Sequence, residues 1–215
     1  MKLKRAIIYD FDGVICDSVN VKTEAFAEMY RPYGDHIVSQ VVNYHLLNGG
    51  VSRFEKFKYF HNKFLGIEID QVLVDQMAEQ FASLVMHKVI VSEFIPGSFE
   101  FIKSRSENYL QFVCTGTPES EILEILRQRN LSSFFNGIYG SPQKKVGIIK
   151  RIASEFNIPT AEMVFFGDSM TDYDATIEMN VDFIGIMNEH TIFPDGTVLI
   201  QDFYSEKLKN IFNKN

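Results

Sequence analysis

The sequence predicts an α/β fold in which a parallel sheet carries helices on both faces and a helical segment is inserted after the first strand. From about residue 98 onward, short apolar runs alternate with stretches of helical periodicity, and this alternation is typical of parallel sheets. Between about residues 19 and 90 only helical periodicity is present. The length of 215 residues accommodates one large domain or a core with a modest insertion.

The first predicted strand is the apolar run Ala6–Tyr9, which ends at Asp10. Asp12 follows two residues later, and residues two apart in extended backbone point to the same side, so both carboxylates can face one small volume. Gly13 then allows a tight turn with positive φ. Neighbouring carboxylates repel unless a cation lies between them. The pattern is typical of Mg²⁺ beside a nucleophilic Asp, although an ordinary Asp-Gly turn also explains it.

Four helices are predicted in the inserted segment. They cover Val21–Met29, Ile37–Leu47, Phe54–Phe64 and Leu73–Val85. The second of them ends at Asn48-Gly49-Gly50, which is a helix-stop signal. The evenly spaced phenylalanines of the third are typical of core packing rather than of a ligand site.

Alternating helices and strands are predicted for the rest of the chain. The helices are Ser98–Ser106, Glu119–Arg129, Val146–Phe156, Tyr173–Met179 and a last one that ends near Phe212. The strands are Leu110–Cys114, Gly137–Gly140, Met163–Phe166, Asp182–Ile186 and Val198–Ile200. Ligands of such sheets bind beyond the carboxyl ends of the strands, so the residues that follow the strands are the candidates for a site.

Polar residues follow two of these later strands. In F-V-C-T-G, the hydroxyl of Thr115 and the backbone amide of Gly116 can hold a phosphate oxygen, aided by the N-terminus of the next helix; Thr before a helix is also a common N-cap. In G-S-P-Q-K-K, Lys144 and Lys145 are both candidates for the fixed positive charge that a phosphate-binding carboxylate site needs.

A further acidic motif, F-F-G-D-S-M-T-D, ends the strand predicted at Met163–Phe166. Asp168 would complete a magnesium site with Asp10 and the backbone carbonyl of Asp12, because Mg²⁺ prefers oxygen ligands and retains several waters. Asp172 would bind through water or orient the loop and Lys145. A first-turn acid that complements a helix dipole is the alternative for Asp172.

These motifs together resemble those of the haloacid dehalogenase superfamily, in its branch of small-molecule phosphatases and phosphomutases. The resemblance rests on D-F-D-G-V-I-C-D-S at 10–18, on Thr115, on the lysine of G-S-P-x-x-K and on G-D-S-x-x-D at 167–172. It implies a Rossmann-like core of residues 1–18 and 92–215 with an all-α cap of residues 19–91. The cap closes over the site and supplies substrate contacts.

The same resemblance implies a role for each motif residue. Asp10 attacks phosphorus, and Asp12 protonates the leaving oxygen and then deprotonates the hydrolytic water. Thr115 and Lys145 hold the phosphoryl oxygens, with G-S-P-x-x-K favouring Lys145 over Lys144. The expected cofactor is Mg²⁺, with Asp10, Asp12, Asp168 and Asp172 as its site.

The cap loop Gly50–Arg53 resembles that of β-phosphoglucomutase, in which the matching arginine holds the phosphate that does not react. Ser52 and Arg53 are therefore candidate substrate contacts, and a helix cap and a solvated first-turn residue are the alternatives. Those mutases carry a histidine in the hinge where this chain has Lys22, which favours hydrolysis. We count Lys22 as a further candidate substrate contact.

The predicted function is Mg²⁺-dependent hydrolysis of a small phosphomonoester, with a sugar or sugar-acid phosphate favoured. A sugar phosphomutase and a non-catalytic regulatory or binding module are the alternatives. The net charge of −7 and pI near 5.3 argue against nucleic acid as a partner. No apolar run reaches the length of a membrane helix, and neither a signal peptide nor a zinc-type Cys or His spacing is present. The expected location is cytoplasmic, as a monomer or a dimer.

Overall fold

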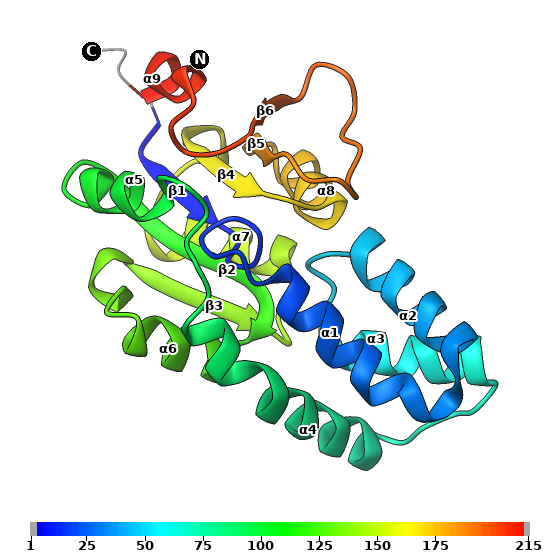
Figure 1. Ribbon diagram of the computed structural model, residues 1–215. Helices are drawn as coiled ribbons and strands as arrows, with labels where there is room; N and C mark the ends of the chain where they lie inside the picture. The colour runs from blue at the N-terminus through cyan, green and yellow to red at the C-terminus, as the bar shows by residue number, and fades with distance from the viewer. Residues whose placement is uncertain (1–3, 213–215) are drawn as a thin grey trace.

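The computed structural model describes residues 4–212, and a parallel β-sheet forms its centre (Figure 1). The order of its strands is β3-β2-β1-β4-β5-β6, and all neighbours pair in parallel. The strands are β1 (Ala6–Tyr9), β2 (Leu110–Pro118), β3 (Gly137–Ser141), β4 (Met163–Gly167), β5 (Asp182–Ile186) and β6 (Val198–Ile200). The predicted parallel sheet is confirmed, and the first strand lies in its middle.

The side chains of the central strands alternate between two hydrophobic clusters, as expected for strands buried on both faces. On β1, Ile7 and Tyr9 belong to one cluster, and Ala6 and Ile8 to the other. Helices α5, α6 and α9 contribute to the first cluster, and α7 and α8 to the second. Their bounds are α5 (Ser98–Arg105), α6 (Glu119–Gln128), α7 (Lys145–Glu155), α8 (Met170–Met179) and α9 (Glu206–Phe212).

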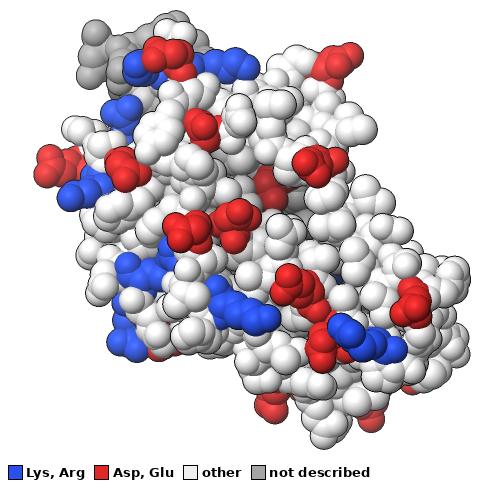
Figure 2. All heavy atoms as spheres, viewed as in Figure 1, with Lys and Arg blue, Asp and Glu red and all other residues white. Residues whose placement is uncertain are grey.

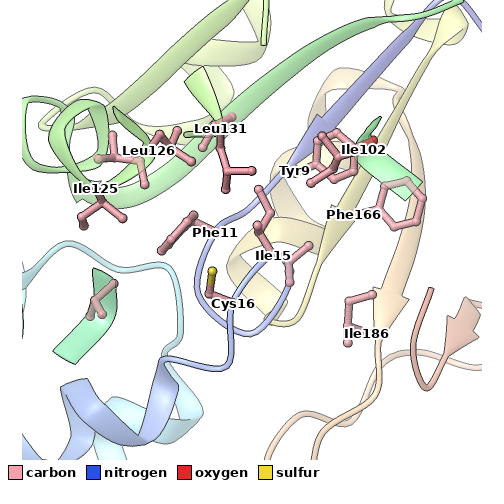
Figure 3. Packing of buried hydrophobic residues seen from close by; sticks show 14 of the residues in the cluster. Tyr9, Phe11, Ile15, Cys16, Ile102, Ile125, Leu126, Leu131, Phe166 and Ile186 are labelled. Carbon is pink, nitrogen blue, oxygen red and sulfur yellow. The ribbon is translucent and has the colours of Figure 1, made fainter. Parts of the chain in front are cut away.

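The first of these clusters anchors the loop that follows β1. Figure 3 shows Tyr9 and Phe166 close together, and Phe11 and Ile15 on the loop after β1, where they belong to the same cluster. The rings of Tyr9 and Phe166 stack with their centroids 5.4 Å apart. Burying such a side chain stabilises the fold by roughly 1.5–3 kcal/mol. Because Phe11 is fully buried, the two acids on either side of it have fixed positions.

Four α-helices between residues 19 and 90 form a separate helical group beyond the carboxyl ends of the strands (Figure 1). They are α1 (Val19–Tyr30), α2 (Asp35–Leu47), α3 (Arg53–Phe60) and α4 (Gln71–Ile90). The ring of Phe26 contacts the rings of Phe57, Phe60 and Phe81. The phenylalanines of the third predicted helix therefore belong largely to a core, as predicted. Helical structure continues as a π-helix over His61–Leu65.

Two segments connect this helical group to the sheet, and they run side by side. The amide of Asp17 donates to the carbonyl of Glu93 at 2.9 Å, and the amide of Ile95 donates to the carbonyl of Ile15 at 3.0 Å. Cys16 and Phe94 form an antiparallel bridge. We propose residues 19–91 as the cap and the remainder as the core, with these paired segments as the hinge between them.

Two elements near the strand ends differ from their predicted bounds. β2 continues through Thr115 and Thr117 to Pro118, because β-branched residues favour extended backbone. α8 begins at Met170 rather than near Tyr173, since Ser169 and Asp172 form a capping box at its N-terminus. No helix among residues 4–212 is long and apolar enough to cross a membrane.

Candidate active site

A cavity of about 500 Å³ lies between the carboxyl ends of the strands and the cap helices. This volume is in the range of small-molecule sites. Its walls include the core residues Asp10, Asp12, Thr115 and Asp168 as well as residues of α1, α2 and α3. On the face shown in Figure 2, acidic and basic side chains are interspersed over core and cap.

Asp10 lies directly after β1 and is 3% exposed. Its Oδ1 accepts a hydrogen bond from the amide of Phe11 at 2.6 Å, and Lys145 Nζ is 2.5 Å from its Oδ2. Lys145 is the first residue of α7 and also contacts Asp172. Its neighbour Lys144 is exposed, with Nζ 3.9 Å from Glu55 Oε1. The structure thus brings Lys145, not Lys144, to the carboxylate of Asp10.

Three carboxylates lie around this lysine. Oxygens of Asp10, Asp168 and Asp172 are all within 4.8 Å of one another. Burial raises the pKa of Asp10 to about 6; Lys145 opposes the rise and Asp172 adds to it. Burial, Asp172 and Asp10 also raise the pKa of Asp168 well above its usual value. Although burial opposes it, the same Asp10 and Asp172 raise the pKa of Lys145 above its usual value, so the lysine stays charged.

One lysine does not balance three neighbouring carboxylates, and a cation would relieve the repulsion among them. The donors are all carboxylate oxygens, which is the chemistry that Mg²⁺ prefers. Gly13 makes room for one of them. It has φ +73°, and a Cβ at this position would lie 2.3 Å from Oδ2 of Asp168. The donor set therefore fits a hard divalent ion.

The carboxylate of Asp12 has separate partners and does not belong to this acid cluster. Its Oδ1 accepts from the hydroxyl of Ser18 at 2.6 Å, and its Oδ2 contacts Lys22 Nζ and accepts from the hydroxyl of Thr117 at 3.2 Å. Burial opposes ionisation, but Lys22, Ser18 and Thr117 hold the pKa of Asp12 below its usual value. Asp12 is thus ionised at rest. The predicted use of its backbone carbonyl as a ligand stays a prediction.

Thr115 and Gly116 lie where the cap approaches the end of β2. Thr115 is buried, and its hydroxyl oxygen accepts from the amide of Thr117 at 3.3 Å. A Cβ on Gly116 would lie 2.5 Å from the carbonyl oxygen of Gly50. On the other side of this loop, the hydroxyl of Thr171 donates to the carbonyl of Gly49. Glycine at 116 lets the cap loop close against the core.

The two predicted cap contacts both have protein partners. The hydroxyl of Ser52 accepts from the amide of Glu55 at 3.4 Å and caps α3. The guanidinium of Arg53 is buried, with NH1 3.1 Å and NH2 2.6 Å from the carboxylate of Glu121 in α6. Arg53 lines the cavity, but its charge is already paired across the boundary between cap and core. The predicted contacts of Ser52 and Arg53 with a substrate stay predictions.

Several cavity residues escaped the sequence analysis. Thr117 lies two residues after Thr115 on one strand, so the period of two could have indicated it. Asn188, whose side chain donates to the backbone carbonyl of Asp168 at 2.7 Å, belongs to no motif. The buried His45 and Lys56 line the cavity from α2 and α3. Only the packing of these two helices brings them together.

Comparison with known proteins identifies a family. The model of the haloacid dehalogenase-like hydrolases matches residues 7–186, which is most of the chain. A phosphorylated carbohydrates phosphatase of Thermotoga maritima is 26% identical over 210 residues, covering 91% of this chain and 90% of that protein.

Solved structures show the same fold. A β-phosphoglucomutase from Clostridium difficile has a TM-score of 0.78 at 17% identity, covering 99% of this chain and 98% of the other. A haloacid dehalogenase-type hydrolase from Bacillus subtilis, bound to magnesium, has a TM-score of 0.69 at 20% identity, covering 99% of this chain and all of the other.

Proposed function

The chain belongs to the haloacid dehalogenase-like hydrolases, and from that premise we propose that it is a Mg²⁺-dependent phosphatase that hydrolyses a small phosphomonoester through a phosphorylated Asp10. One observation carries the proposal. The carboxylate of Asp10, held by Lys145 and the amide of Phe11, faces the cavity beside two further carboxylates. A nucleophile, a fixed cation and a set of oxygen ligands are the parts that phosphoryl transfer requires.

In the first step, a carboxylate oxygen of Asp10 attacks phosphorus and the bond from phosphorus to the ester oxygen breaks. Lys145 and Thr115 hold the phosphoryl oxygens, with the amide of Gly116 as a further donor. Asp10, Asp168 and Asp172 would hold a Mg²⁺ ion, which would supply positive charge to offset the negative charge on these oxygens. The leaving oxygen then needs a proton.

Asp12 handles this proton. Its pKa is low because Lys22 lies beside it, so it must first take up a proton for the acid role. A phosphate monoester loses its second proton near pH 6, and a substrate that binds as the monoanion brings that proton with it. In the second step Asp12, ionised again, accepts a proton from the water that attacks phosphorus and releases Asp10.

The comparisons support this proposal at the level of chemical class. The relative from Thermotoga maritima is named for phosphorylated carbohydrates, and the neighbour from Bacillus subtilis contains magnesium. We therefore propose a small phosphorylated metabolite as the substrate and Mg²⁺ as the cofactor.

The balance between phosphate release and isomerisation tests hydrolase against mutase. With Mg²⁺, a hexose 1-phosphate and a bisphosphate primer, we expect free phosphate to exceed isomerised sugar phosphate by about tenfold or more, because Lys22 keeps Asp12 ready to activate water. Phosphate is measured colorimetrically and the sugar phosphates by NMR. Isomerisation faster than phosphate release would establish the mutase instead, and absence of both over a broad panel of phosphate esters would favour a binding module.

A further inference from the structure

A buried lysine and a buried histidine meet on the cap side of the cavity. Lys56 of α3 is 2% exposed and His45 of α2 is 7% exposed, and both line the cavity. Nζ of Lys56 is 2.8 Å from Nδ1 of His45. The proposed chemistry uses neither residue, and burying two ionisable groups without a function costs free energy.

The protonation of His45 follows from its surroundings. Burial, Lys56 and Lys22 lower the pKa of His45 well below its usual value, so the imidazole is neutral, with one N–H donor and one acceptor nitrogen. An ammonium group only donates, so Nδ1 accepts from Lys56 and Nε2 carries the hydrogen. A backbone hydrogen bond with Val19 opposes this lowering of the pKa, but by distance and angle Nε2 has no hydrogen-bond partner among residues 4–212. Two donors therefore lie at this wall.

Three other cations near the cavity each have a carboxylate partner. Lys22 pairs with Asp12, Arg53 with Glu121, and Lys145 with Asp10 and Asp172. Within the described part of the chain, Lys56 contacts the imidazole of His45 but no carboxylate. Burial lowers the pKa of Lys56 to about 7, as expected for an ammonium group without a counter-ion. An anion at this wall would restore its charge.

We infer that Lys56 Nζ and His45 Nε2 bind a carboxylate of the substrate, so that the enzyme acts on a phosphomonoester that also carries a carboxylate, such as a phosphorylated hydroxy acid or sugar acid. The inference rests on the phosphatase function proposed above. One unpaired cation balances one negative charge, which favours a carboxylate over a second phosphate dianion. A carboxylate also offers one oxygen to each of the two donors. We assign the carboxylate to Lys56 and His45 rather than to Arg53, because the guanidinium of Arg53 is already paired with Glu121.

Matched substrate pairs test the assignment. We compare 3-phosphoglycerate with glycerol 3-phosphate and 6-phosphogluconate with sorbitol 6-phosphate, pairs that differ only by a carboxylate in place of a hydroxymethyl group. In at least one pair, the acid should have a kcat/KM about tenfold or more above that of the alcohol, mainly through KM. A hexitol bisphosphate, which carries a second phosphate, should not exceed the acid; if it does, the carboxylate assignment is wrong.

Variants locate the preference within the cap. Lys56→Met should bring the ratio of acid to alcohol close to one, and His45→Phe should lower it. Lys63→Met removes an exposed lysine of the same cap and should leave the ratio unchanged, as should Arg53→Met. Circular dichroism confirms that each variant folds. If Arg53→Met and not Lys56→Met abolishes the preference, the anion site lies at Arg53 and the assignment is overturned.

A binding measurement separates this inference from the phosphatase function. In the Asp10→Asn variant with Mg²⁺, the imidazole ¹⁵N resonances of His45 should shift on addition of the acid and not of the alcohol, without any turnover. If this shift appears in Asp10→Asn although the parent enzyme hydrolyses none of the esters, the carboxylate site is supported and the phosphatase function is wrong. If the parent enzyme hydrolyses both members of each pair equally, the inference is wrong. It is also wrong if the acids leave the His45 resonances unchanged, whether or not the parent enzyme is a phosphatase.

Discussion

Replacement of Asp10 by Asn is expected to lower kcat for phosphate release by at least about 10⁴-fold, because an amide cannot form the phosphorylated carboxylate. The amide is nearly isosteric, so the hydrogen bond from the amide of Phe11 to Oδ1 can persist. Lys145 also retains its contact with Asp172. The loss should therefore arise in the chemical step and not in folding.

Asp35→Asn provides the matched control for this variant, since Asp35 is exposed at the start of α2. It should retain the full rate of phosphate release. Thermal unfolding of both variants and of the parent checks that the fold is intact. An Asp10→Asn enzyme that keeps more than about a hundredth of the parent kcat would exclude Asp10 as the nucleophile.

Removal of divalent metal is expected to lower activity by at least about a thousandfold, and added Mg²⁺ should restore it. Without a cation, the carboxylates of Asp10, Asp168 and Asp172 repel one another and the incoming phosphate, and Lys145 alone faces them. Phosphate release is measured after treatment with EDTA and during titration with Mg²⁺. Ca²⁺ should replace Mg²⁺ poorly, because its coordination is looser.

Asp168→Ala sharpens this test. The variant should need a far higher Mg²⁺ concentration for half-maximal activity, and the rise in melting temperature that Mg²⁺ causes through binding to the folded state should shrink. The exposed Asp35→Asn control should behave like the parent in both measurements. Full activity in EDTA, or an unchanged Mg²⁺ requirement in Asp168→Ala, would contradict the metal site.

The fold could be predicted largely from periodicity. Alternating apolar runs and helical stretches predicted the parallel sheet, and the residues directly after the strands, Asp10 and Asp168, were placed at one edge for the same reason. The order of the strands was not predicted, because it depends on long-range pairing that no local pattern encodes. The start of α8 was placed too late, although a first-turn helix acid was the alternative for Asp172; this residue contributes both to the helix cap and to the site.

The site was only partly predictable. Lys144 and Lys145 are adjacent in sequence, and only the start of α7 decides which of them is buried against Asp10. The pairing of Arg53 with Glu121 was not predicted, because Glu121 lies in a helix far along the chain. His45 and Lys56 show no motif because their proximity depends on how α2 and α3 pack. Sequence patterns therefore indicated the residues at the strand ends and two cavity residues of the cap, Lys22 and Arg53, but missed His45 and Lys56.

Detection of a phosphorylated Asp10 tests the central claim most directly. Asp12→Asn lacks the base that activates water, so with an ester that has a good leaving group the phosphorylated enzyme should accumulate. After acid quenching, peptide mass spectrometry should find one phosphoryl group on Asp10 in the Asp12→Asn enzyme and none in the double variant with Asp10→Asn. Phosphate released without any phosphorylated Asp10, or a phosphoryl group found on another residue, would contradict the account.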